Sequence, residues 1–363
     1  MRQTPAHTHS GHQTRPDHRP AAFRGIPGSR LTRLEYGSGK EKRVVTSALP
    51  QKASRDIAAG IAVTLIIFAL TLNLPLIGFF LAVFIPLPVL FYRAKLGRRN
   101  GTWVLGLTSV AMTAIIGGLS LDALFYLELL VLGFAIGEML FMRLSVERTV
   151  LYAVAVVLGT SSAFLLLYGL SLQVGISTVI SDYVLKSLKL TLAIYEKMGI
   201  SQDAIRLMSD SMEQIQYVLV RILPALAVGS TLFVAWVNLL MARSVLLSRD
   251  LFFPDFGPLN RWKVPEVLVW GVIASALLLL FPSRAMKVIG LNGLIVFMVV
   301  YFLEGIAIVS FFFEKKQFPR FLRSTIYVFI FIQQIICLLV IGLGFFDTWL
   351  DFRRLSTPPQ NSE

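Results

Sequence analysis

The sequence predicts an all-α protein, a polytopic transmembrane helix bundle with about eight to nine spans. Hydrophobic residues make up 55% of its 363 residues and charged residues only 15%. With a mean hydropathy of +0.71, the chain is too apolar for an ordinary soluble fold of this length. Lys and Arg concentrate at the N-terminus and in short segments between long apolar runs. This pattern reflects membrane topology, so the net charge of +13 does not indicate nucleic-acid binding.

Residues 1–56 are predicted to form a disordered basic tail. They hold 11 of the 34 Lys and Arg residues and hardly any apolar run, so they cannot bury enough apolar surface to fold. The irregular spacing of the histidines favours a solvated tail over a metal site. We predict no metal site and no cofactor. The four histidines, all in this tail, are His7, His9, His12 and His18.

Residues 57–355 are predicted to form the membrane domain, and residues 356–363 a second disordered tail. The apolar stretch 57–92 is broken by Pro75 and again by Pro86 and Pro88. Each half is about long enough to cross a hydrocarbon core of roughly 30 Å. The predicted spans lie near 57–74, 76–92, 102–119, 121–142, 149–171, 218–242, 265–281, 288–313 and 325–346.

Charge predicts the orientation of these spans. Four segments, 93–101, 143–148, 243–264 and 314–323, hold 14 Lys and Arg residues, whereas the intervening segments on the other side hold eight in much more sequence. The richer side is expected to be cytoplasmic. We therefore predict a cytoplasmic N-terminus and, with nine spans, a C-terminus outside. Arg353 and Arg354 count against the outside C-terminus.

Residues 172–217 are predicted to be an extramembrane insert of amphipathic helices. Apolar residues recur at helical spacing from Ile176 to Leu188. After Gly199, Ser201 could cap a second helix that carries Ile205, Met208, Met212 and Ile215. These helices would lie on the outer surface, where they either cover a cavity or simply pack on the bundle.

The helix over residues 121–142 is expected to lie at the centre of the bundle. It carries Glu128 and Glu138 inside an apolar span, with Gly133 and Gly137 between them. The glycines lie about 140° and 180° around the helix from Glu128. One face is therefore shaped for close approach of another helix, while the carboxyls are costly in lipid if they are left unpaired.

Four intramembrane polar residues are candidates for a ligand or ion pathway, and each could instead hydrogen-bond a neighbouring helix. They are Glu128, Glu138, Asn292 and Glu304. A second pair of small residues, Ala58 and Ala62, matches the small-x-x-x-small pattern of helix packing or partner contact, as do Gly133 and Gly137.

The sequence predicts that the protein is not an enzyme. It contains no H-E-x-x-H, no G-x-S-x-G and no Walker motif. No histidine lies in the predicted membrane domain to activate a Ser or Cys nucleophile. The lone cysteine, Cys337, is interpreted as an inert packing residue.

Short motifs in the C-terminal third resemble the YybS-like predicted membrane proteins of bacteria. They are Arg261-Trp262-Lys263-Val264-Pro265, Gly290-Leu291-Asn292, Tyr301-Phe302-Leu303-Glu304-Gly305, Gly342-Leu343-Gly344-Phe345-Phe346-Asp347 and Asp351-Phe352-Arg353-Arg354. Pro86-Leu87-Pro88 with Arg93 and Gly97 adds to the resemblance at the N-terminal end. This family is a domain of unknown function, and the resemblance implies a location in the bacterial cytoplasmic membrane.

The chain is also distantly similar to the S components of energy-coupling-factor transporters. In that family, small residues of the first helix contact the partner, and Ala58 and Ala62 match that spacing. This similarity implies a solute-binding transport component that works with an ATPase and a coupling membrane subunit. The alternative is a non-catalytic membrane scaffold in cell-envelope assembly or division, in which the polar residues lock helices together. Apart from the lipid bilayer, the residues identify no further partner.

Overall fold

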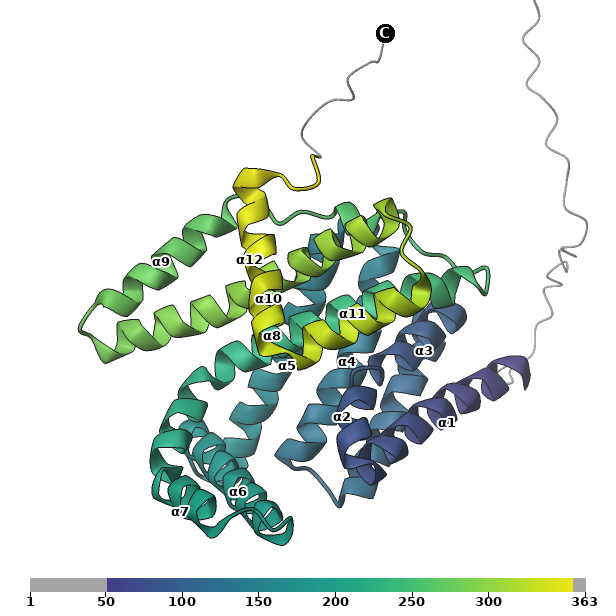
Figure 1. The fold of residues 1–363 in the computed structure, drawn as a ribbon. Coiled ribbons are helices and arrows are strands. Elements are labelled where there is room, and N and C mark those ends of the chain that lie inside the picture. The colour runs from purple at the N-terminus through teal and green to yellow at the C-terminus, as the bar shows by residue number, and fades with distance from the viewer. Residues whose placement is uncertain (1–50, 355–363) are drawn as a thin grey trace, which may run out of the picture. The chain divides into compact units, whose positions relative to one another are not determined.

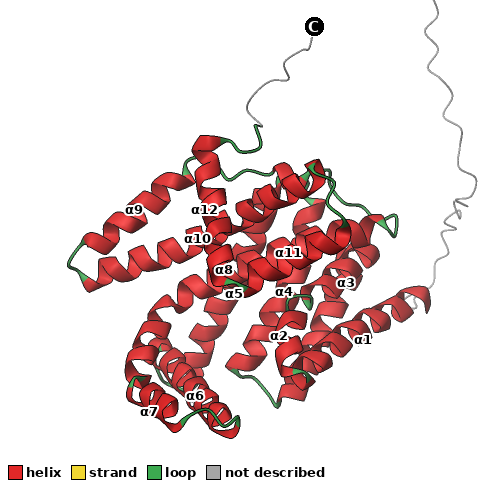
Figure 2. Cartoon of the chain, viewed as in Figure 1, coloured by secondary structure: helices red, strands yellow, loops and turns green. Residues whose placement is uncertain are grey.

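Every regular element of the described chain is helical. The structure is a computed structural model and describes residues 51–354. Within this range Figure 1 labels the helices, and Figure 2 shows loops but no strand between them. The predicted all-α class is therefore confirmed. The elements are α1 (Gln51–Asn73), α2 (Pro75–Ala82), α3 (Pro86–Ile116), α4 (Leu121–Phe141), α5 (Val146–Ser171), α6 (Ile176–Lys197), α7 (Gln202–Asp210), α8 (Met212–Leu247), η1 (Leu259–Arg261), α9 (Leu268–Leu280), α10 (Arg284–Lys315), α11 (Arg320–Ile332) and α12 (Gln334–Leu350).

The two predicted tails lie largely outside the described residues. Residues 1–50 and 356–363 fall beyond them. Residues 51–56, which the sequence placed in the tail, instead form the beginning of α1. The helix therefore extends past its apolar part into the charged segment that precedes Ile57.

Six helical stretches are long and apolar enough to cross a membrane, judged by length and composition. They are α1, the joined stretch Ile77–Ile116, α4, α5, α8 and α10. The bent pair α11 and α12 raises the number to seven if it is one span. The chain is thus a multi-pass membrane protein, whereas the predicted count of eight to nine spans is not confirmed.

The chain reverses direction at Gly97, inside α3. A Cβ atom added to Gly101 would lie 2.9 Å from the Cα of Arg93, although eight positions in a straight helix separate residues by about 12 Å. Gly97 has φ 77° and ψ 174°, a conformation that glycine adopts far more readily than other residues. The predicted segments 76–92 and 102–119 therefore lie in two different legs of the chain.

Helix α4 packs against α3, α5 and α8, so several neighbours surround it. Ser120 caps its first turn, because the hydroxyl accepts a hydrogen bond from the Ala123 N–H at 3.1 Å. The glycine face is turned to the N-terminal leg of α3. A Cβ at Gly133 would lie 2.2 Å from the carbonyl oxygen of Pro86, and one at Gly137 would lie 2.8 Å from the Cγ of Arg93. The missing side chains let the two backbones approach closely.

The insert contains the two predicted helices, but the second is shorter than predicted. Helix α6 begins at Ile176, and α7 is capped by Ser201, whose hydroxyl accepts a hydrogen bond from the Ala204 N–H at 3.4 Å. The pattern that continued to Ile215 is interrupted at Ser211, where α7 ends and α8 begins. Figure 1 shows α6 and α7 beside each other.

The apolar segment predicted as one span over 325–346 is two helices. Helices α11 and α12 meet at an angle of 101°. Gln333 leaves the helical conformation, with φ −94° and ψ 107°, and its carbonyl accepts the Cys337 N–H as α12 begins. Helix α9 also differs from the predicted span 265–281. Its 13 residues extend only about 20 Å, less than a hydrocarbon core of roughly 30 Å.

The bent pair α11 and α12 returns to the end of the bundle from which it starts. Asn260 contacts both ends of the bent pair. Its amide donates to Glu314 at the end of α10, just before α11. Its carbonyl accepts from Arg353 Nη1, just after α12, at 3.1 Å. Arg353 therefore lies on the same side as the segment 243–264. The prediction that the segment after Phe346 lies opposite residues 243–264 is wrong for Arg353, because Arg353 contacts Asn260 and Trp262 of that segment.

Candidate functional site

Glu128 joins two neighbouring helices. The hydroxyl of Ser161, on α5, donates a hydrogen bond to Glu128 Oε1, on α4. The single proton of this hydroxyl is shared with the Val157 carbonyl of its own helix, which lies 2.8 Å from the hydroxyl oxygen. Glu128 thus occupies a contact between α4 and α5, where its polar group has a protein partner.

Glu138 forms an ion pair one residue after the glycine face of α4. Arg93 Nε lies 2.5 Å from Glu138 Oε1, and Arg98 Nε lies 3.8 Å from Oε2. The Arg93 guanidinium also lies 4.5 Å from the ring centroid of Phe141. Because Gly137 has no side chain, Arg93 can pass across α4 to reach the carboxylate. This pair fastens α3 to α4.

Ala58 and Ala62 lie on the exposed side of α1. The buried side of that helix carries Ile57, Gly60 and Thr64 instead. The small residue that permits a close approach within the described chain is therefore Gly60, where an added Cβ would lie 2.9 Å from the Tyr92 ring. Both Ala58 and Ala62 remain exposed when only the described residues are considered.

Asn292, on α10, hydrogen-bonds two backbone groups of α8 at the turn that contains Pro224. Pro224 removes one backbone donor from α8 and disturbs the preceding turn. Asn292 Oδ1 accepts the Ala225 N–H at 2.9 Å, and its Nδ2 donates to the Arg221 carbonyl at 2.8 Å. In a regular helix these two backbone groups would bond each other. The amide of Asn292 is inserted between them and so holds α10 to α8.

Replacing Asn292 with alanine should destabilise the protein by about 1–3 kcal/mol, because two backbone groups inside the membrane lose their partner. Unfolding of the purified protein in mixed detergent micelles would measure this loss. Asn73→Ala is the matched control, since the Asn73 amide bonds only the Ala69 carbonyl of its own helix. Equal losses for the two variants would contradict the role assigned to Asn292.

Glu304 belongs to a buried ionic cluster with Asp347 and Arg353. Arg353 Nη2 lies 2.8 Å from Asp347 Oδ2 and 3.2 Å from Glu304 Oε1, and all three side chains are fully buried. Asp347 Oδ1 also accepts the Phe352 N–H at 2.8 Å. Glu304 comes from α10, Asp347 from α12 and Arg353 from the residues that follow α12. We call these three residues the ionic cluster.

The ionic cluster also holds the loop before α9. Arg353 Nη1 donates to the carbonyl oxygens of Asn260 and Trp262, at 3.1 and 2.8 Å. The Trp262 indole N–H donates to Glu147 Oε1 at 2.8 Å, and its ring centroid lies 4.4 Å from that of Trp236. One guanidinium thus ties the C-terminal residues to α10 and to a loop that is fastened to α5 and α8.

Close helix contacts bring the carboxylates of the ionic cluster together. A Cβ at Gly305 would lie 2.0 Å from the Val340 carbonyl oxygen, and one at Gly344 would lie 2.0 Å from that of Tyr301. The two glycines are therefore required where α10 and α12 cross. Each lies within three residues of a carboxylate of the ionic cluster, so the crossing positions Glu304 beside Asp347.

The four candidate pathway residues do not converge. Glu128, Glu138, Asn292 and Glu304 occupy four separate helix contacts. Sequence reasoning missed Asp347, Arg93 and Arg353 as partners of these carboxylates, although all three occur in the motifs of the family resemblance. The available signal was the set of short C-terminal motifs, because three of them supply Glu304, Asp347 and Arg353. A fourth supplies Trp262.

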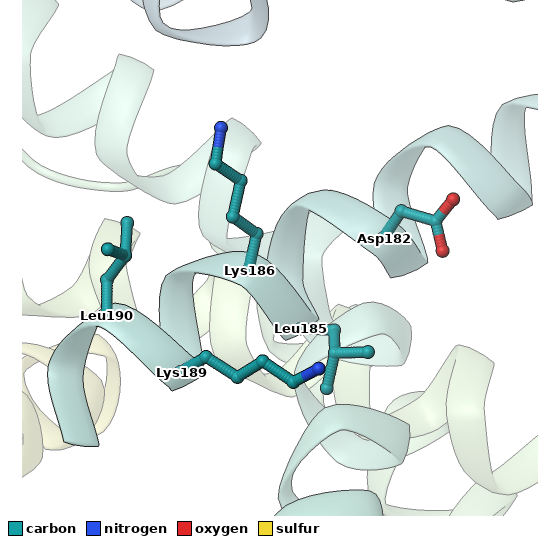
Figure 3. A pocket seen from close by; sticks show the side chains of 5 residues that line it. All are labelled: Asp182, Leu185, Lys186, Lys189 and Leu190. Atoms are coloured by element: carbon teal, nitrogen blue, oxygen red, sulfur yellow. The ribbon is translucent and has the colours of Figure 1, made fainter. Parts of the chain in front are cut away.

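Helix α6 carries an open hollow in the insert, lined by Asp182, Leu185, Lys186, Lys189 and Leu190. Figure 3 shows the ammonium groups of Lys186 and Lys189 extending in different directions. The hollow therefore does not present two cations to one anion. Within residues 51–354, no group of three or more His, Cys, Asp or Glu side chains is placed to hold a metal ion.

Comparison with known proteins gives the following matches. The model of a family described as predicted membrane protein (DUF2232) matches residues 62–348. The chain is 22% identical over 317 residues to the uncharacterized protein YybS of Bacillus subtilis (strain 168), a match that covers 84% of this chain and 99% of that protein. No solved structure matches. The family match includes Glu304 and Asp347 and ends before Arg353.

Proposed function

The chain belongs to the DUF2232 family of predicted membrane proteins, and from this premise we propose that it is a non-catalytic membrane scaffold. It would serve cell-envelope assembly or division in the bacterial cytoplasmic membrane, with its N-terminus in the cytoplasm. The observation that carries this proposal is that the polar side chains of the membrane helices form bonds to other parts of the protein. Each of the four candidate pathway residues bonds a different part of the protein.

Such bonds support a structural role because unpaired polar groups are costly in hydrocarbon. A solute-binding site would instead bring several polar groups to a common space. Here Asn292 bonds the backbone of α8, and Glu138 bonds Arg93 of α3. These residues fix which helices are neighbours, and a fixed bundle is what a scaffold presents to its partners.

A solute-binding transport component of the energy-coupling-factor type is the second candidate. The observation that favours it is the exposure of Ala58 and Ala62 on α1. Small residues on an exposed face would let a helix of a coupling membrane subunit approach closely. An ATPase bound to that subunit would then supply energy. In this version the solute would enter from outside, near the insert.

The two candidates predict different assemblies in mild detergent. We would purify the tagged full chain from its native membrane and determine the assembly by native mass spectrometry. A scaffold should be recovered alone as an oligomer or with envelope-building proteins. A stoichiometric ATPase with a coupling subunit, or a bound small molecule, would overturn the scaffold proposal in favour of transport.

Two glutamine substitutions test the structural use of the carboxylates. Glu128→Gln should be nearly neutral, because the amide oxygen can still accept from Ser161. Glu138→Gln should cost about 1–3 kcal/mol, since Arg93 is largely buried and loses its counter-charge. Unfolding in mixed micelles measures both losses, and native mass spectrometry of the variants reports the assembly. Loss of a co-purifying small molecule in folded Glu128→Gln protein would contradict the scaffold role.

A further inference from the structure

The ionic cluster has an unbalanced formal charge. Two carboxylates, Glu304 and Asp347, share the single guanidinium of Arg353, and none of the three side chains reaches solvent. If all three groups are ionised, the cluster holds one net negative charge. Burying an uncompensated charge is strongly unfavourable. The cluster is therefore expected to acquire one further positive charge.

The charged and titratable groups around Glu304 come from four parts of the chain. Asp347 belongs to α12, Arg353 to the segment after it, Lys263 to the loop before α9, and Tyr301 to α10 itself. Lys263 is only partly buried and forms no ion pair with either carboxylate of the ionic cluster. It does not neutralise the cluster by contact.

Hydrogen bonding singles out Glu304 as the unsatisfied carboxylate. Both oxygens of Asp347 have donors, namely the Phe352 N–H and Arg353 Nη2. Glu304 Oε1 receives Arg353 Nη2 at 3.2 Å, whereas its fully buried Oε2 has no hydrogen-bond partner. The Val264 N–H interacts with the Glu304 carboxyl, but Oε2 itself has no partner at hydrogen-bond geometry. A proton on Oε2 would remove the excess charge.

We propose that Glu304 is a proton-binding site that controls the contact of Arg353 with the loop before α9. With the proton bound, the ionic cluster is neutral and Arg353 remains paired with Asp347. When the proton leaves, the buried negative charge favours hydration, which requires the residues after α12 to move away from the loop. This inference is independent of the scaffold or transport role, because it concerns one proton and one internal contact.

The direction of the pH dependence follows from proton counting. The closed contact holds one proton on Glu304, whereas the open, hydrated form holds none, because a hydrated carboxyl is ionised at neutral pH. The closed form binds more protons, so its stability is present at low pH and is lost as the pH rises. The contacts between Arg353 and the carbonyls of Asn260 and Trp262 are the ones that should open.

Infrared difference spectroscopy of the full chain in nanodiscs tests the protonation directly. We expect a band from a protonated carboxyl group at low pH that disappears as the pH rises and is absent in Glu304→Gln. Glu314→Gln is the matched control, because Glu314 lies on the same helix and bonds Asn260 outside the ionic cluster. Absence of the band in wild-type protein at every pH would overturn the proposal, without any variant having to fold.

A distance measurement tests the coupling. Spin labels at the exposed positions Arg261 and Arg354, in a Cys337→Ser background, should separate on raising the pH from 5 to 9. Glu304→Gln should stay closed throughout that range, because it mimics the neutral side chain. The proposal would be overturned if the two labels also separated in Glu304→Gln. It would equally be overturned if the distance between the labels in the parent protein responded to sodium ions and not to pH.

Discussion

Replacing Arg353 with methionine is expected to lower the free energy of unfolding by about 3–5 kcal/mol, the cost of breaking a buried ion pair by removing one partner. Glu304 and Asp347 would remain buried without their cation. Two loop carbonyls, those of Asn260 and Trp262, would also lose a donor. Methionine keeps much of the length of the side chain, so the loss reports charge and hydrogen bonding more than volume.

Unfolding in mixed detergent micelles, followed by circular dichroism, would measure the loss. Arg354→Met is the matched control, because Arg354 is the exposed neighbour of Arg353 and should change stability by less than about 0.5 kcal/mol. The double variant Glu304→Gln with Arg353→Met should lose less than the sum of the single losses. Additive losses would show that the two side chains do not interact.

Replacing Gly133 with valine should be the most damaging glycine substitution in α4. Even its Cβ atom would lie 2.2 Å from the backbone carbonyl oxygen of Pro86, and backbone cannot move aside as a flexible side chain can. Overpacking of this kind costs about 1–3 kcal/mol and sometimes more. We expect a loss at the upper end of that range, because α3 and α4 must separate along their contact.

The same unfolding assay measures this loss, with Gly159→Val as the control. A Cβ at Gly159, on α5, meets nothing within 4 Å, so the control should change stability by only a few tenths of a kcal/mol. If Gly133→Val is as stable as Gly159→Val, then α3 and α4 do not approach as closely as the structure shows. Separation of α3 from α4 should also weaken the Arg93–Glu138 pair, which lies one turn further along α4.

Much of the fold could be predicted from the sequence. Apolar composition and the length of the apolar runs determined the membrane class and the all-α architecture, because each span must satisfy its backbone groups within its own helix. Local signals determined several helix ends, including Ile176 at the start of α6 and Ser201 at the start of α7. Gly133 and Gly137 indicated a close helix contact on one face of α4, since a missing side chain is visible in the sequence itself.

Only the tertiary structure decided where the last apolar segment goes. Residues 325–346 are apolar enough for a span, yet they bend by 101° at Gln333. No proline or glycine occupies that position, so composition gave no indication of a break. The residues after α12 are held by contacts of Arg353 with the Asn260 and Trp262 carbonyls, which lie far away in the sequence.

The partner of each buried polar residue was likewise decided by the tertiary structure. Arg93 and Glu138 are 45 residues apart, and Glu304 and Arg353 are 49 apart. Helical periodicity reports which face of its own helix a residue occupies, but not which other helix covers that face. The sequence by itself therefore determined that Glu128, Glu138, Asn292 and Glu304 needed partners in the membrane. Which groups meet those needs depends on how the helices pack, because only packing brings distant residues within hydrogen-bond distance.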